Sequence, residues 1–101
     1  MSVLSELAVL AETRTQEYAD AANASADCEA DYWRCLFKAE SGCEETSVAA
    51  RERYAQGCCV DEKVAWVRAE KAEKVAKQSV ATTLARLSAA QSYYRLVERQ
   101  T

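Results

Sequence analysis

The fold is decided by residues 4–39, which read LSELAVLAETRTQEYADAANASADCEADYWRCLFKA. Apolar and small side chains recur along this stretch in alternating steps of three and four residues. The recurring positions, called seam 1 below, are Leu4, Leu7, Ala11, Arg14, Tyr18, Ala21, Ser25, Cys28, Tyr32, Cys35 and Ala39. A heptad pattern sustained over this length is typical of a helix that packs along another helix. Arg14 is the charged exception in seam 1.

A second seam of the same spacing lies in the C-terminal half of the chain. Its positions, called seam 2, are Trp66, Ala69, Glu73, Ala76, Val80, Thr83, Leu87, Ala90, Tyr94 and Val97. Between the seams, Thr46 or Ser47 can cap a shorter helix that Gly57 ends. The pattern predicts a long helix over about 3–41, a short helix over about 47–57 and a long helix over about 61–99.

The expected helix ends follow from single residues. Ser2 or Ser5 can cap the first helix, and Gly42 can supply a left-handed residue just after it. Asp61 is the expected cap of the last helix. The chain has no internal repeat and no Pro-rich or Ser-rich linker, so we predict a single helical domain over residues 1–101.

Helices of this length exclude a compact sphere. A first helix of about 37 residues is about 55 Å long, whereas a globule of this size has a radius of gyration near 13 Å. We therefore predict an elongated antiparallel helical hairpin. Its seams are rich in alanine and bury little apolar area, while further apolar side chains lie off them. These are Val9, Leu10, Leu36, Phe37, Val64, Val67, Val75, Leu84, Tyr93 and Leu96. The sequence thus predicts a coiled-coil-like homo-oligomer.

Composition narrows the class of protein. The 101 residues include two glycines and no proline, too few turn residues for an all-β fold. No apolar run is long enough to span a membrane. The start, MSVLSELAVLAE, lacks the basic region and cleavage site of a signal peptide. We expect a soluble, cytoplasmic protein without a membrane partner.

Side-chain chemistry argues against an enzyme. The chain has no histidine, which removes the commonest general base and metal ligand. Its five cysteines (Cys28, Cys35, Cys43, Cys58 and Cys59) lack the spacing of a zinc site, and their odd number without an export signal argues against a disulfide framework. We expect reduced, packed thiols. No nucleophile elbow, phosphate loop or catalytic acid pair is present, so we expect no catalysis, cofactor, metal or small-molecule substrate.

Charge divides the chain into two halves. Residues 1–50 carry a net charge of −7 and residues 51–101 a net charge of +4. Either the two long helices lie against each other with opposite signs, or the C-terminal half meets an anionic partner.

The last helix carries the candidate binding residues. Basic side chains fall away from seam 2, and we predict a single-stranded DNA surface made of Arg68, Lys71, Lys74, Lys77, Arg86, Arg95 and Arg99. Lys63 lies on the same half of the helix. Trp66, Tyr93 and Tyr94 can stack on unpaired bases. An ordinary solvated helix face is the alternative explanation.

Two segments, SVAARERYA (47–55) and LARLSAAQSYYRLVERQ (84–100), combine an Ala-Arg-Glu-rich helix start with a terminal helix that contains Ser and Arg. In this pattern, roughly the last 55 residues resemble phage recombination-mediator proteins. The family pattern has an arginine before Ser92, where this chain has Gln91. The resemblance implies a phage protein that loads a recombinase or annealing protein onto single-stranded DNA as a ring or other oligomer. The residues it transfers are Arg51, Arg53, Arg95 and Arg99.

Three functions remain open at this point. The first is a non-catalytic helical accessory protein that binds single-stranded DNA, a recombination protein, or both. The second is a helical adaptor or inhibitor that binds only protein, such as a phage antagonist of a host factor or a secretion co-chaperone. The third is a capsid, scaffold or other structural part.

Overall fold

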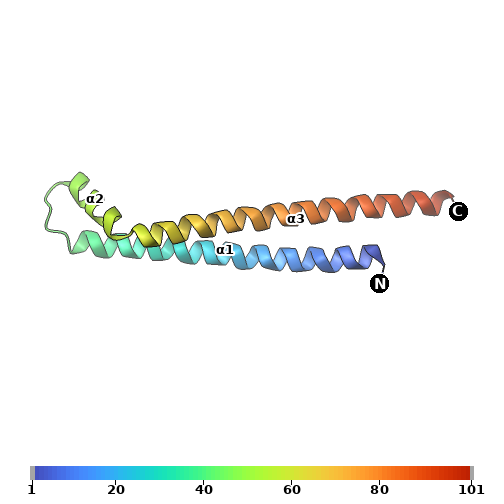
Figure 1. The fold of residues 1–101 in the computed structure, drawn as a ribbon, viewed down its shortest axis with the longest axis horizontal. Helices are drawn as coiled ribbons and strands as arrows, with labels where there is room; N and C mark the ends of the chain where they lie inside the picture. Colours follow the sequence, from blue (N-terminus) through green and yellow to red (C-terminus); the bar gives the residue numbers. More distant parts are fainter. Residues whose placement is uncertain (1, 101) are drawn as a thin grey trace.

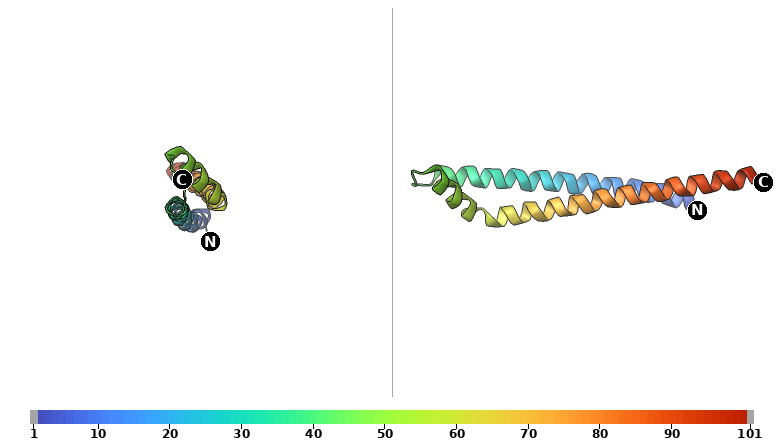
Figure 2. Two further views of the ribbon diagram at one scale, coloured as in Figure 1. Left: turned by 90° about the vertical axis from the view of Figure 1, so that its left-hand side faces the viewer. Right: turned by 90° about the horizontal axis from the view of Figure 1, so that it is seen from above.

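The computed structural model describes residues 2–100, which form helices α1 (Val3–Ser41), α2 (Val48–Cys58) and α3 (Val60–Gln100). The long helices α1 and α3 lie side by side and antiparallel, and the short α2 packs against the end of α1 (Figure 1 and Figure 2). The predicted all-α hairpin is confirmed. Its extents are 79 × 21 × 13 Å, so the molecule is a rod.

Both predicted seams form the contact between α1 and α3. The buried residues of α1 are Leu7, Ala11, Ser25 and Tyr32, all members of seam 1, and its other members are half-buried. In α3, Thr83 is buried and the remaining seam 2 residues from Trp66 to Ala90 are half-buried. The residues of seam 2 beyond them, Tyr94 and Val97, are exposed. The reason is that α3 runs past the N-terminal end of α1 (Figure 1).

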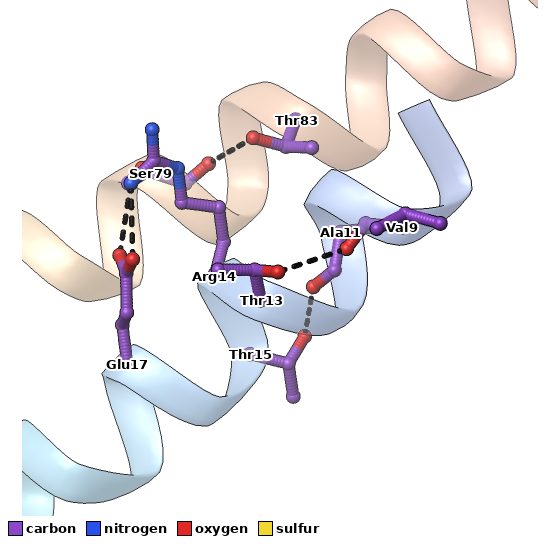
Figure 3. Close-up of polar contacts among 8 residues, drawn as sticks. All are labelled: Val9, Ala11, Thr13, Arg14, Thr15, Glu17, Ser79 and Thr83. Carbon is purple, nitrogen blue, oxygen red and sulfur yellow. Dashed lines mark hydrogen bonds and ion pairs between the residues drawn. The ribbon is translucent and has the colours of Figure 1, made fainter. Parts of the chain in front are cut away.

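Small polar residues in the seams satisfy their hydroxyls locally. Thr83 donates a hydrogen bond to the carbonyl of Ser79 at 2.8 Å, and Thr15 donates to the carbonyl of Ala11 at the same distance (Figure 3). A buried hydroxyl without a partner would cost free energy, whereas these bonds stay within one helix turn. Thr83 can therefore sit between the helices without a partner on α1.

The caps expected at the starts of α1 and α2 form as predicted, whereas the conformation expected at the end of α1 does not. The hydroxyl of Ser2 caps α1 by accepting from the N–H of Ser5 at 3.1 Å, and Ser47 caps α2 by accepting from Ala50 at 3.4 Å. The left-handed conformation expected at Gly42 is wrong, because its φ and ψ are −92° and −1°. The N–H of Gly42 instead bonds to the Lys38 carbonyl and continues the right-handed turn.

The junction between α2 and α3 also differs from the prediction. Gly57 does not end α2, which continues to Cys58, and Asp61 is not the cap of α3, which begins at Val60. A single residue, Cys59, separates the two helices with φ −114° and ψ 27°. Its N–H closes α2 by bonding to the Ala55 carbonyl, and its own carbonyl accepts from Lys63 to open α3.

Cys59 is fully buried and forms a disulfide with Cys35 of α1. The expectation of five reduced thiols is therefore wrong for this pair. Seam 1 turns Cys35 toward α3, and the one-residue junction brings the Cys59 Cα to within 5.9 Å, inside the range that a disulfide needs. Cys28 and Cys43 remain half-buried free thiols, and Cys58 is an exposed one.

The rod leaves much of its surface open to solvent. Its radius of gyration is 22.4 Å, against about 13 Å for a globule of this length. Its accessible surface is 7496 Å², against about 5,700 Å² expected for a compact monomer of this mass. Of the ten apolar residues noted off the seams, Leu10 and Leu36 are half-buried and the other eight are exposed. The predicted unpartnered apolar surface is confirmed, and self-association stays a prediction.

We predict that Arg14→Leu stabilises the hairpin by about 1 kcal/mol, because it replaces a charge at a seam position with buried apolar surface. Arg14 forms an ion pair with Glu17 at 2.9 Å, a type of exposed pair that contributes little. Arg34→Leu is the matched control, since Arg34 pairs with Asp31 at the same spacing but off the seam. Urea unfolding should separate the two variants, and equal effects would contradict this account of seam 1.

We predict that reducing the disulfide lowers the free energy of unfolding by about 3 kcal/mol, because the unfolded chain gains the freedom of a loop closed across 24 residues. Urea unfolding with and without dithiothreitol measures the change. In Cys35→Ser the same reductant should change nothing. An unchanged midpoint for the wild-type protein would contradict a disulfide that stabilises the fold.

Candidate nucleic-acid interface

The seven predicted DNA-binding residues all lie on α3 and are all exposed. They are Arg68, Lys71, Lys74, Lys77, Arg86, Arg95 and Arg99. The helix as a whole carries eight basic and five acidic side chains, whereas α1 carries three basic and eight acidic ones. The acidic and basic halves thus lie side by side, as one of the two charge interpretations requires. The ion pairs Arg14–Glu17 and Asp31–Arg34 each stay within α1, so neither one joins α1 to α3.

The basic residues do not form one straight stripe. Arg68, Lys71, Lys74 and Lys77 follow each other in steps of three residues. Each step falls about 60° short of a full turn of the helix, so the four cations spiral about halfway around α3 over a rise of about 14 Å. We call this group the basic spiral.

Arg86 lies apart from the basic spiral. It lines a shallow groove of about 390 Å³ between α1 and α3, together with Arg14, Leu10 and Thr82. Arg14 and Arg86, from different helices, therefore line the same groove, although the guanidinium of Arg14 donates to Glu17 (Figure 3). Arg86 thus lies at the flank of the hairpin, beside α1.

Trp66 packs in the helix contact, as its position in seam 2 predicts, and its role in base stacking stays a prediction. Its ring packs 5.5 Å from that of Tyr32 across the helix contact and 6.4 Å from that of Trp33. The Lys63 ammonium lies 4.2 Å from the Trp66 ring centroid and 5.0 Å from that of Tyr32, a cation–π arrangement. Trp66 is therefore a packing residue, and Lys63 is held at the turn end of the hairpin.

Tyr93 and Tyr94, the other two aromatic residues suggested for base stacking, lie near the C-terminal end of α3. They lie on residues 91–100 of α3, called the overhang, which are all exposed and run beyond α1 (Figure 1). Tyr93 is 63% exposed and Tyr94 37%, and their rings meet edge to face at 5.7 Å. Arg95 and Arg99 stand on the same segment. The overhang therefore combines two exposed aromatic faces with two guanidinium groups.

The residues transferred by the resemblance are divided between two places. Arg51 and Arg53 lie on α2, far along the rod from Arg95 and Arg99 (Figure 1). Arg51 is half-buried, and its guanidinium donates to the Thr46 carbonyl at 3.3 Å, which ties α2 to the loop before it. Arg53 is exposed. The structure brings no single surface together from all four.

A second cluster at the turn was missed by sequence reasoning. The sulfur atoms of Cys35 and Cys59 and a carboxylate oxygen of Glu62 all lie within 4.8 Å of one another. Cys59 was expected in a loop and Asp61 as the cap of the last helix. The sequence pattern therefore did not connect Glu62 with the two cysteines. The seam 1 position of Cys35 and the three-residue spacing from Cys59 to Glu62 were the available signals.

Tyr54 stands beside two of the free thiols at the same end of the molecule. A side-chain hydrogen bond with Cys58 raises the pKa of the Tyr54 phenol above its usual value, and electrostatic interactions with Cys58 and Cys43 act in the same direction. Four of the five cysteines therefore gather near the turn.

No family model, curated protein or solved structure matches this chain. In the part of the chain that the structure describes, no helix is long and apolar enough to cross a membrane.

Proposed function

We propose that the protein is a non-catalytic helical accessory protein that self-associates and binds single-stranded DNA, in partnership with a recombination protein. The overhang carries this proposal, because it presents Tyr93 and Tyr94 together with Arg95 and Arg99 on a helix that α1 no longer covers. Aromatic faces and cations in one segment are what sequence-tolerant single-strand binders use. The phage origin and the recombination partner rest on the resemblance of residues 47–55 and 84–100, and a cytoplasmic location belongs to the same proposal.

The basic spiral supplies the second part of the binding surface. Its four exposed cations lie about halfway along the rod, so a strand stacked on the overhang can follow α3 toward them. Each phosphate that they neutralise releases counterions and adds affinity at low salt. Self-association would present several such surfaces to one strand, which multiplies a weak contact into a strong one.

We predict that labelled oligothymidine binds the protein with an affinity that falls steeply between about 50 and 200 mM salt, as anisotropy can measure. In Lys71→Glu/Lys74→Glu, the slope of log affinity against log salt should become shallower by about 1.4, because two phosphate contacts are lost. Arg34→Glu/Lys38→Glu on α1 makes the same charge change and should leave the slope unchanged. No binding at about 50 mM salt would reject the DNA proposal.

A second variant separates stacking from charge in the same experiment. Tyr93→Leu keeps an apolar side chain but removes the aromatic face. The affinity for oligothymidine should fall about tenfold, which is in the lower part of the range for the loss of one stacked base. The slope of log affinity against log salt should not change. Val75→Leu, another exposed apolar position on α3, is the control. If Tyr93→Leu and the wild-type protein bind with equal affinity, base stacking on the overhang is contradicted.

We predict that the protein sediments as a dimer or larger species at micromolar concentration, because the rod exposes about 1,800 Å² more surface than a compact monomer. Sedimentation velocity should be run in reductant, so that the exposed Cys58 cannot crosslink two copies. A monomer at every concentration measured would contradict self-association. It would not contradict DNA binding, which the anisotropy experiment tests separately.

A protein-only adaptor is the second candidate function. It is favoured by large apolar side chains that stand exposed away from the basic spiral on α1, namely Phe37 at 74% and Trp33 at 56%. Exposed aromatic residues are typical of protein-binding surfaces. Recovery of one dominant partner from nuclease-treated source cells, together with no DNA binding at low salt, would select this function.

A further inference from the structure

We propose that Cys35, Cys59 and Glu62 form a redox-controlled binding site for a thiophilic divalent cation, for which Zn²⁺ is the model. The disulfide is then the closed, oxidised form of the site, and the reduced form binds the metal. The inference is independent of DNA binding, because it concerns the turn end of the rod and not the outer surface of α3.

The three side chains come from three separate parts of the fold. Cys35 lies near the end of α1, Cys59 is the single residue between α2 and α3, and Glu62 lies in the first turn of α3. Their ligand atoms lie within 4.8 Å of one another. Cys59 is fully buried and the other two are half-buried, so the cluster is partly shielded from water. Such shielding strengthens the attraction between a cation and its anionic ligands.

Glu62 is the unexplained member of this group. It is half-buried, and within residues 2–100 its carboxylate has no hydrogen-bond or ion-pair partner. The neighbouring Lys63 is directed to the rings of Tyr32 and Trp66 instead. A position in the first turn of a helix favours an acid in general, but it does not account for a carboxylate that faces two sulfur atoms. A cation between the three groups would account for it.

The chemistry of the donors selects the class of metal. Two thiolates and one carboxylate suit Zn²⁺ and similar soft or borderline ions, whereas Mg²⁺ and Ca²⁺ require oxygen ligands. Three protein ligands leave a fourth tetrahedral position for water, which is the open type of zinc site. Two thiolates and a carboxylate carry three negative charges, so a divalent cation also removes most of their mutual repulsion.

The redox step balances with a dithiol as reductant. The dithiol gives two electrons and two protons to the Cys35–Cys59 bond, becomes a disulfide itself, and leaves two thiols. The cation then displaces two protons as both thiols bind to it as thiolates. Disulfides are rare in the cytoplasm, where protein dithiols and small-molecule thiols keep cysteines reduced. In the proposed cytoplasmic setting, the bound metal ion would therefore replace the disulfide as the link between α1 and the start of α3.

Reduced, metal-free protein is the sample that tests the site. It is titrated with Co²⁺ under argon, and the absorption bands of thiolate-bound tetrahedral cobalt are recorded. Zn²⁺ is then added to displace the cobalt, and a chromogenic chelator counts the zinc that is bound. The proposal expects one ion per chain for the reduced protein and none for the oxidised protein, in which the thiolates are absent.

Three variants define the ligands. Cys35→Ser should abolish the thiolate-to-cobalt bands, and Glu62→Gln should weaken the affinity about tenfold or more, with helical content preserved in circular dichroism. Cys28→Ser changes a half-buried thiol on the same seam outside the cluster and should bind like wild type. Absence of a stoichiometric ion in the reduced wild-type protein, or unaltered affinity in Glu62→Gln, would overturn the proposal.

Discussion

The antiparallel contact between seams 1 and 2 is the interaction on which the rest of the structure depends, and its register is fixed mainly at the turn. There the Cys35–Cys59 disulfide and the packing of Tyr32 on Trp66 hold α1 and α3 in one alignment. A shift of one heptad would slide the helices by about 10 Å, break the disulfide and separate the aromatic rings. The same alignment leaves residues 91–100 uncovered, so the overhang is a direct consequence of contacts made at the opposite end of the rod.

The strength of the contact changes along the rod. Near the turn, large rings, a cation–π arrangement and a covalent bond coincide. Farther along, Leu7 is buried, but the other buried positions, Ser25, Ala11 and Thr83, are small and each removes little apolar surface from water. Local opening should therefore begin at the end that carries the N-terminus and the overhang. A binding surface at the less stable end can adapt to a flexible ligand without disturbing the turn.

The heptad spacing predicted the two long helices and nearly every residue of their contact, while the capping residue at 46 or 47 predicted the short helix between them. This worked because the pattern repeats many times and each repeat carries the same information. The errors lie at Gly42, Gly57 and Asp61, where a single residue was taken to end or start a helix. Glycine lowers helix propensity by about 1 kcal/mol, an amount that α2 overcomes by packing on α1 and by the covalent bond next to it.

The disulfide and Glu62 were missed for a related reason. Both depend on residues that are distant in sequence and meet only once the helix register is known. The heptad pattern placed Cys35 correctly on the inner face, but it predicted a loop at Cys59, and a loop position does not indicate which residue faces it. The basic residues were assigned to α3, and the spiral of Arg68, Lys71, Lys74 and Lys77 follows from their three-residue spacing, whereas the groove that Arg86 lines together with Arg14 required the three-dimensional positions.

The acidic character of the whole chain is compatible with the proposed DNA binding because the charges are separated in space. α1, with a net charge of −5, runs along one side of α3, whose net charge is +3. Beyond about 8 Å at physiological salt, exposed charges are largely screened from one another. The carboxylates of α1 therefore weaken the field of α3 most on the side they share and least on the outer side and the overhang. An anionic strand would accordingly meet the overhang first and then extend along the outer side of α3 toward the basic spiral.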